Sequence, residues 1–138
     1  MSQKYIHIQC EDYALLTDIR HIEQVVNAAD SGNGEMPADI TWQDKTIPCL
    51  DLTRILTGGK RKPNRHCIIM KDREQGQRFL AVAVGQVSNI ESIAESDFEE
   101  LPNLDFPFNN YFNKAYIDKK DKRCIYRLKN LLETDAAP

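Results

Sequence analysis

The sequence lacks any apolar run that approaches the roughly 20 residues of a membrane-spanning helix. It also lacks an N-terminal stretch of the signal-peptide kind, because Met1 to Lys4 lead straight into strand-like sequence. Nor are basic residues in excess: 18 Lys and Arg face 21 Asp and Glu, for a net charge of −3. Since duplex-binding proteins usually carry a basic excess, we expect no nucleic-acid partner. Because the signal peptide and the membrane-spanning run are missing, we expect a cytoplasmic protein with no membrane insertion.

Closely spaced cysteines are also missing. The four cysteines, Cys10, Cys49, Cys67 and Cys124, form no CxxC pair, and each lies in an apolar or alternating run. A cysteine in such a run behaves as a small hydrophobic side chain. We therefore expect free thiols in a reducing compartment, with no metal site and no cofactor.

Tryptophan occurs once, at Trp42, and the stretch around it carries the clearest local structure. Residues 40–56 predict a strand, a tight turn at Gln43-Asp44-Lys45, a second strand that contains Pro48, and a short helix. Either Asp51 or Thr53 is suited to cap that helix, since its side-chain oxygen can accept a free backbone N–H. Gly58-Gly59 then predicts the helix end.

Most of the remaining chain consists of short alternating segments separated by turn residues. Strands are predicted at Lys4–Cys10, Tyr13–Leu16, His66–Met70, Arg78–Val84, Lys114–Ile117 and Arg123–Tyr126. The segment Ile19–Val26 fits either a short helical turn or the start of a strand. Strands this short, with turns roughly 8–12 residues apart, are typical of small β-barrels and indicate a mainly β fold.

An internal repeat organises these elements. Ile19–Val25 matches Val87–Ile93, and the helical triplet Leu52, Ile55 and Leu56 is answered by Leu128, Leu131 and Leu132. We interpret residues 1–138 as one domain with two intertwined five-stranded barrels and short helices. The subdomains span about residues 13–65 and 66–132, share the N-terminal strand, and precede a frayed tail at 133–138. A seam between two such units is the default binding surface.

Charge and aromatic residues are segregated along the chain. Glu91–Asp105 has six acidic residues and no basic one, whereas Lys114–Lys129 has seven basic and two acidic residues. Such segments either steer a partner or pair with each other. The linker Gly58–Arg65 carries four basic residues, which suit either an acidic partner or a solvated connection. In the aromatic cluster Phe106–Phe112, side chains that are not buried would form a contact surface.

The order of these motifs resembles the CheW family, the coupling proteins of bacterial chemosensory arrays. The resemblance rests on Tyr13-Ala14-Leu15, on Ile19-Arg20-His21-Ile22 and on Thr46-Ile47-Pro48-Cys49-Leu50-Asp51-Leu52, and it extends from about Lys4 to Leu132. It implies two SH3-like subdomains and a non-enzymatic adaptor of chemotaxis or motility signalling. The implied partners are the regulatory domain of a CheA-type histidine kinase and the cytoplasmic tip of a chemoreceptor.

The same resemblance suggests partner-binding residues. By analogy, Gln24, Val25 and Asn27 lie near the kinase-facing surface, and Trp42, Gln43 and Asp44 near the receptor-facing surface. An exposed Trp42 would be the strongest anchor, since tryptophan is enriched at binding hot spots, whereas a buried Trp42 would rule that role out.

This chain departs from the family pattern at the same turn. The arginine that contacts receptors in the family aligns with Gln43, and the following glycine aligns with Asp44. Loss of the guanidinium removes a fixed fork of donors and a charge. Two readings follow: an adaptor that joins kinase to receptor, or a divergent adaptor that serves a pilus-motility or other signalling protein without receptor coupling.

Two function classes outside the family have weaker support. Cys124, with its basic neighbours, is the best candidate for a thiol nucleophile, but no Cys/His spacing supports it, so we expect no catalytic residue. Tyr116 and Tyr126 in the basic C-terminal hairpin would suit a binder of single-stranded nucleic acid.

Overall fold

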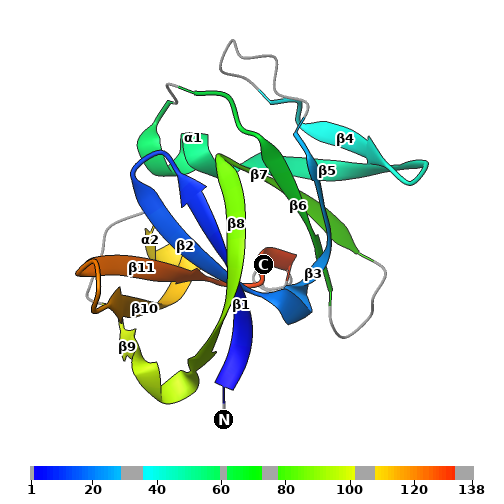
Figure 1. The fold of residues 1–138 in the computed structure, drawn as a ribbon. Coiled ribbons are helices and arrows are strands. Elements are labelled where there is room, and N and C mark those ends of the chain that lie inside the picture. Colours follow the sequence, from blue (N-terminus) through cyan, green and yellow to red (C-terminus); the bar gives the residue numbers. More distant parts are fainter. Residues whose placement is uncertain (1, 29–35, 60–61, 73–77, 102–107, 133–138) are drawn as a thin grey trace.

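The computed structural model describes residues 2–28, 36–59, 62–72, 78–101 and 108–132, and most of them lie in two curled β-sheets (Figure 1). In sheet order, the six-stranded sheet contains β8 (Gln86–Ala94), β1 (Ser2–Cys10), β2 (Tyr13–Asp18), β11 (Arg123–Leu128), β10 (Phe112–Asp118) and β9 (Phe98–Glu100). The five-stranded sheet contains β3 (Ile22–Asn27), β6 (His66–Lys71), β7 (Phe79–Val84), β5 (Lys45–Asp51) and β4 (Asp39–Trp42).

Helical structure is brief. Among the described residues, the helical elements include the α-helices α1 (Leu52–Thr57) and α2 (Phe108–Tyr111) and the 3₁₀-helices η1 (Ile19–His21) and η2 (Glu95–Asp97), and Leu131 and Leu132 are helical as well. The prediction of a mainly β fold with two intertwined small barrels and short helices is therefore confirmed, since the strands form two curled sheets. One sheet has a sixth strand because the three-residue β9 pairs with β10 at its edge. Among the described residues, no helix is both long and apolar enough to cross a membrane.

The two sheets draw strands from both halves of the sequence. β6 and β7 follow residue 65 but belong with β3, β4 and β5, and β1 and β2 belong with the C-terminal strands. Each sheet also contains one parallel pair, β2 with β11 and β5 with β7, while its other pairs are antiparallel. The chain is thus interwoven, and the subdomain limits at 13–65 and 66–132 stay a prediction.

The repeated segment lies at a corresponding place in each sheet. Ile19–Val26 combines both expected structures, because η1 covers its first three residues and β3 begins at Ile22. β3 is an edge strand of the five-stranded sheet, and β8, which contains the matching segment Val87–Ile93, is an edge strand of the six-stranded sheet. The repeat in sequence is therefore also a repeat in topology.

The stretch around Trp42 folds as its turn chemistry predicts. β4 and β5 form an antiparallel hairpin in which Trp42 pairs with Lys45, so the turn comprises Gln43 and Asp44, and Lys45, which was predicted to lie in the turn, begins β5. Both turn residues have positive φ, 49° and 64°. A two-residue turn with this backbone matches the right-handed twist of its flanking strands.

Helix α1 begins and ends at the expected residues. Asp51 is the N-cap, and its side chain accepts a hydrogen bond from the Arg54 backbone N–H at 3.2 Å. Gly58 ends the helix with φ 78°, a left-handed backbone that glycine adopts at little cost. Thr53, the other capping candidate, is buried, and its hydroxyl donates to Asn64 Oδ1 at 2.8 Å.

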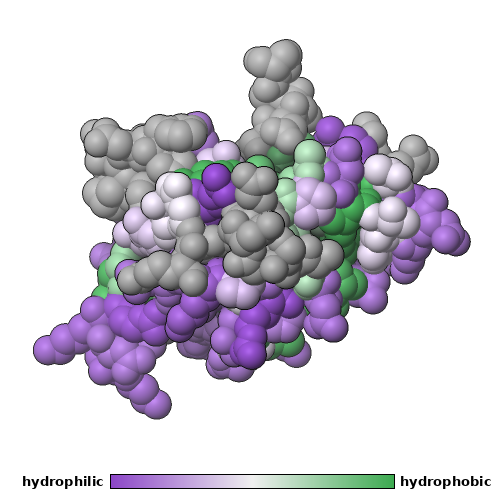
Figure 2. Space-filling view, turned by 90° about the horizontal axis from the view of Figure 1, so that it is seen from above, coloured by the Kyte–Doolittle hydropathy of each residue, from purple (hydrophilic) through white to green (hydrophobic). Residues whose placement is uncertain are grey.

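A shared hydrophobic core joins the two sheets. It takes Leu15 from the six-stranded sheet, Ile68 and Val82 from the five-stranded sheet, and Leu52 from α1, all fully buried. Each sheet also has a smaller core of its own: one gathers Tyr5, Ala14, Leu16, Ile93, Phe98 and Ile125, and the other gathers Trp42, Ile47, Ile69 and Ala81. Seen from above, the surface is mostly hydrophilic, with hydrophobic residues confined to small areas (Figure 2).

The acidic and aromatic segments are partly described. The acidic segment contains the end of β8, η2 and β9, while residues 102–107 lie outside the described residues. Of the aromatic cluster, Phe112 is buried and stacks on Tyr126 with ring centroids 5.4 Å apart. Leu128, Leu131 and Leu132 are buried in the shared core together with Leu52 and Leu56 of the first-half triplet, whereas Ile55 is half-buried and outside that core.

Candidate functional site

The predicted partner-binding residues come from two segments that the fold brings together. Trp42 Nε1 on β4 donates a hydrogen bond to Gln24 Oε1 on β3 at 2.9 Å, across 18 positions in the sequence. β3 and β4 are the two edge strands of the five-stranded sheet. The hydrogen bond therefore connects opposite edges of one curled sheet.

Trp42 is not an exposed anchor. Its side chain is 7% exposed, it belongs to the core of the five-stranded sheet, and its ring lies 4.8 Å from that of Phe79 between centroids. The ammonium group of Lys45 lies over the Phe79 ring, with Nζ 5.0 Å from the ring centroid. Trp42 therefore does not meet the condition of exposure that a hot-spot role requires, and Gln43 and Asp44 are the exposed residues of the turn.

A groove of about 410 Å³ lies between β3 and the β4–β5 hairpin. It is lined by Val26, Asn27, Pro37, Asp39, Ile40, Thr41, Trp42, Gln43 and Cys67. Three of the predicted residues, Asn27, Trp42 and Gln43, thus share one surface, and Gln24 is tied to it through Trp42. Val25 instead packs against the shared core, and Asp44 is exposed on the turn beside Gln43.

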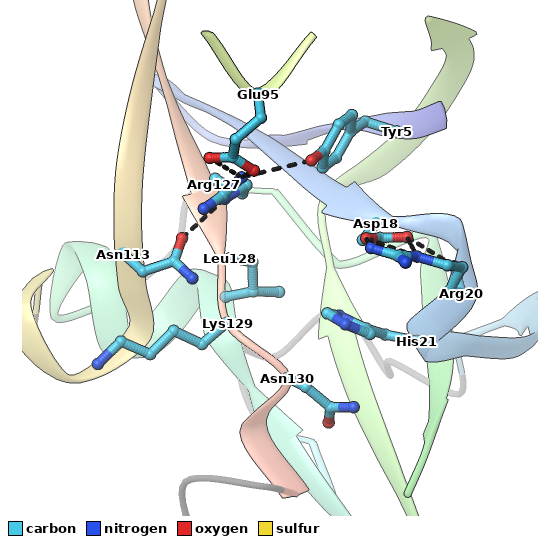
Figure 3. Close-up of a pocket in the computed structure, with 10 residues that line it drawn as sticks. All are labelled: Tyr5, Asp18, Arg20, His21, Glu95, Asn113, Arg127, Leu128, Lys129 and Asn130. Atoms are coloured by element: carbon cyan, nitrogen blue, oxygen red, sulfur yellow. Dashed lines mark hydrogen bonds and ion pairs between the residues drawn. The ribbon is translucent and has the colours of Figure 1, made fainter. Parts of the chain in front are cut away.

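A second cavity, also of about 410 Å³, was not anticipated from the sequence (Figure 3). Its central side chain is Arg127 on β11, which donates to Glu95 Oε1 at 2.9 Å and to Asn113 Oδ1 at 2.9 Å. The guanidinium also lies 4.5 Å from the centroid of the Phe98 ring. Arg127 therefore ties η2, β9 and β10 to its own strand.

The ion pairs of Arg127 bear on the segregated charges. Glu95 and Glu100 from the acidic segment pair with Arg127 and Lys114 from the basic segment. These residues of opposite charge therefore pair within the chain. The sequence shows that acidic and basic residues are segregated, but only the tertiary structure shows which of them form ion pairs.

The opposite side of the same cavity holds a buried carboxylate. Asp18 is 5% exposed and accepts hydrogen bonds from the Arg20 Nη2 at 2.6 Å and from the Arg20 backbone N–H at 2.9 Å. Burial by itself raises the pKa of Asp18. The hydrogen bonds from Arg20 and the nearby His21 outweigh burial and hold that pKa below its ordinary value.

Comparison with known proteins places this geometry in a family. The family model described as CheW-like domain matches residues 4–133. The chain belongs to the CheW-like domain family. A solved structure of the scaffolding protein TtCheW from Thermoanaerobacter tengcongensis is similar to it, with a TM-score of 0.73 and 20% sequence identity over 94% of this chain and 85% of that one. At this identity the likeness shows the shared fold, and no curated protein sequence matches the chain significantly.

The motif that carried the resemblance has a structural role in this CheW-like chain. Asp51 caps α1 and also accepts a hydrogen bond from Asn64 Nδ2 at 2.9 Å. The next residue, Leu52, is fully buried in the shared core. The Asp-Leu pair thus attaches α1 to the linker on one side and to both sheets on the other.

The thiols of the CheW-like chain differ in exposure. Cys10 and Cys67 are buried, Cys49 is half-buried and Cys124 is exposed, and all four are free cysteines. Burial raises the pKa of the Cys10 thiol, which disfavours its reactive thiolate form. Across the described part of the chain, no three His, Cys, Asp or Glu side chains gather in a metal-binding group.

Proposed function

We propose that this CheW-like chain is a non-enzymatic adaptor of a bacterial chemosensory system. It binds the regulatory domain of a CheA-type histidine kinase in the cytoplasm, at arrays that contain receptors. The observation that supports this most is the hydrogen bond between Trp42 and Gln24, since it joins the two segments suggested by the family resemblance.

The groove beside that hydrogen bond has the character of a protein-binding surface. Val26, Ile40 and Trp42 supply apolar lining, while Asn27 and Gln43 supply polar groups. Protein interfaces commonly combine an apolar centre with a polar rim. The Trp42–Gln24 bond also fixes one edge of the sheet against the other, which lowers the entropy lost on binding a partner.

The turn at Gln43-Asp44 is the surface for a second partner. A chemoreceptor tip is the partner that the family suggests. Gln43, however, offers a neutral amide where the family pattern has a guanidinium, which would add a charge and bidentate hydrogen bonding. This residue favours a second candidate function, in which the adaptor binds the kinase and a pilus-motility or other signalling protein instead of a receptor.

The kinase contact is tested by a substitution on the groove rim. Asn27→Arg places a long charged side chain at an exposed position of β3, and we expect binding to the regulatory domain of a CheA-type kinase to weaken at least about tenfold, measured by isothermal titration calorimetry. Asn89→Arg is the matched control, because it makes the same change on β8, the corresponding edge strand of the other sheet. Equal affinities for the two variants would refute the assigned surface.

The receptor contact is tested by restoring the family pattern. We expect Gln43→Arg with Asp44→Gly to raise affinity for a receptor signalling tip roughly tenfold, since a guanidinium is regained. Asp44→Gly alone is the control: it relieves the positive φ of 64° and should stabilise the hairpin by about 0.5–1 kcal/mol without raising affinity. If the double variant gains nothing, the turn is not a receptor contact.

A further inference from the structure

A third cavity, of about 510 Å³, shares no lining residue with the β3–β4 groove or with the cavity around Arg127. It is lined by Gln9, Glu11, Thr53, Lys62, Pro63, Arg65, Gly85 and Gln86. Gln9 lies near the end of β1, Gly85 connects β7 to β8, and Thr53 belongs to α1. The cavity therefore opens where the two sheets and the linker meet, and we call it the linker cleft.

The charges of the linker cleft are unbalanced. Lys62 and Arg65 are exposed, and neither makes an ion pair within the described residues. Glu11 is the only carboxylate in the lining. Arg123 brings a further cation to the rim, because its Nη2 donates to Gln9 Oε1 at 3.0 Å. In the cavity of Figure 3, by contrast, both arginines are paired with carboxylates.

The backbone that carries Lys62 and Arg65 is held in place. Asn64, between them, is 4% exposed and is hydrogen-bonded to Thr53 at 2.8 Å and to Asp51 at 2.9 Å. The Arg65 backbone N–H is shared between the Val84 and Gly85 carbonyl oxygens, at 3.2 and 3.0 Å. Binding of a ligand would therefore order only side chains, which keeps the entropic cost low.

We propose that the linker cleft binds an acidic segment of a partner protein, with aspartate or glutamate carboxylates paired to Lys62 and Arg65. Exposed ammonium and guanidinium groups on a fixed backbone recognise carboxylates through charge-assisted hydrogen bonds. The lining holds no aromatic ring on which a nucleic-acid base could stack, so a protein segment fits better than a single strand of nucleic acid. This site goes beyond the adaptor function and is independent of the β3–β4 groove.

The proposal is tested with a fluorescein-labelled hexaglutamate peptide, whose binding to the full chain is followed by fluorescence anisotropy at low ionic strength. We expect Lys62→Gln with Arg65→Gln to weaken binding roughly tenfold, because both cations of the cleft are lost. Lys119→Gln with Lys120→Gln is the matched control: it removes the same charge from an exposed turn and should change affinity less than about twofold.

Two further variants sharpen the test. Arg65→Lys keeps the charge and should retain most of the affinity, whereas Glu11→Gln removes the one lining carboxylate and should tighten binding about two- to fivefold. Absence of peptide binding, or equal losses in the cleft and control variants, would overturn the proposal. Tighter, cleft-dependent binding of a labelled oligothymidine would overturn it in favour of nucleic acid.

Discussion

At the residue scale, buried polar side chains hold this molecule together through specific partners. Asn64 joins the linker to α1, and Trp42 joins β4 to β3 through the only polar atom of its side chain. Asp18 is the buried charge among them, held by Arg20 on η1. Because a buried polar group is costly without a partner, each of these contacts specifies one arrangement of its neighbouring elements.

Asp18 gives stability a defined pH dependence. The pKa of Asp18 is lowered in the folded state. The ionised carboxylate therefore stabilises the fold at pH values above the ordinary aspartate pKa of about 3.9. This stabilisation is lost as the pH falls through the folded-state pKa. We expect Asp18→Asn to lower the free energy of unfolding by about 1 kcal/mol at pH 7, the half-exposed Arg20 limiting the effect.

The measurement is urea unfolding of both proteins at pH 7 and at pH 3. The difference between wild type and Asp18→Asn should shrink at pH 3, because this pH is below the ordinary aspartate pKa of about 3.9 and the unfolded chain there gains a proton. Asp121→Asn, in the exposed turn before β11, is the control and should differ little from wild type at either pH. A gap that stays constant with pH would show that the charge of Asp18 is not responsible.

At the element scale, the connections between strands decide how closely the sheets approach. The β4–β5 turn uses two positive-φ residues and so keeps the hairpin tight. Gly85 links β7 in one sheet to β8 in the other and lies against β1. A Cβ at Gly85 would come within 2.5 Å of the Gln9 carbonyl oxygen, so this crossover needs a residue without a side chain.

Gly85→Ala is therefore expected to destabilise the protein. The clash involves backbone on both sides, so relief requires movement of β1 or β8, and we expect a loss of about 1–3 kcal/mol in the free energy of unfolding. Gly59→Ala is the matched control, since a Cβ there would meet no atom within 4 Å. Thermal and urea unfolding of the two variants measure the difference, and equal stabilities would contradict the close approach.

At the scale of the whole molecule, the shared core makes the two sheets one folding unit. Leu15 of the six-stranded sheet and Ile68 of the five-stranded sheet are both 0% exposed in that core. Neither sheet can separate without exposing this apolar surface to water. The interweaving of early and late strands adds the same constraint through the backbone.

This coupling predicts a single unfolding transition. Leu15→Ala should lower the free energy of unfolding by about 2–5 kcal/mol. The urea midpoint should shift equally in Trp42 fluorescence, which reports the five-stranded sheet, and in far-UV circular dichroism, which reports all strands. A Trp42 transition that keeps the wild-type midpoint would show that the sheets unfold independently.

The sequence by itself determined the local structure. The turn after Trp42, the end of α1 at Gly58 and the strand that became β7 depend on backbone preference and alternation within a few residues, whereas the choice of Asp51 over Thr53 as the cap came from the structure. The internal repeat also gave information beyond local structure, because it identified two matching segments that form β3 and β8, the edge strands at corresponding places in the two sheets. The family resemblance pointed to three residues that line the groove, Asn27, Trp42 and Gln43, but not to their exposure.

Tertiary structure alone decided what these elements do together. The indole of Trp42 is buried in the core of the five-stranded sheet and hydrogen-bonded to Gln24, 18 residues earlier in the chain, and Arg127 pairs with Glu95, 32 residues earlier. The linker cleft likewise depends on α1, β1 and the β7–β8 crossover meeting in space. Periodicity and turn chemistry carry no information on such meetings, since strand pairing and packing between distant segments set them.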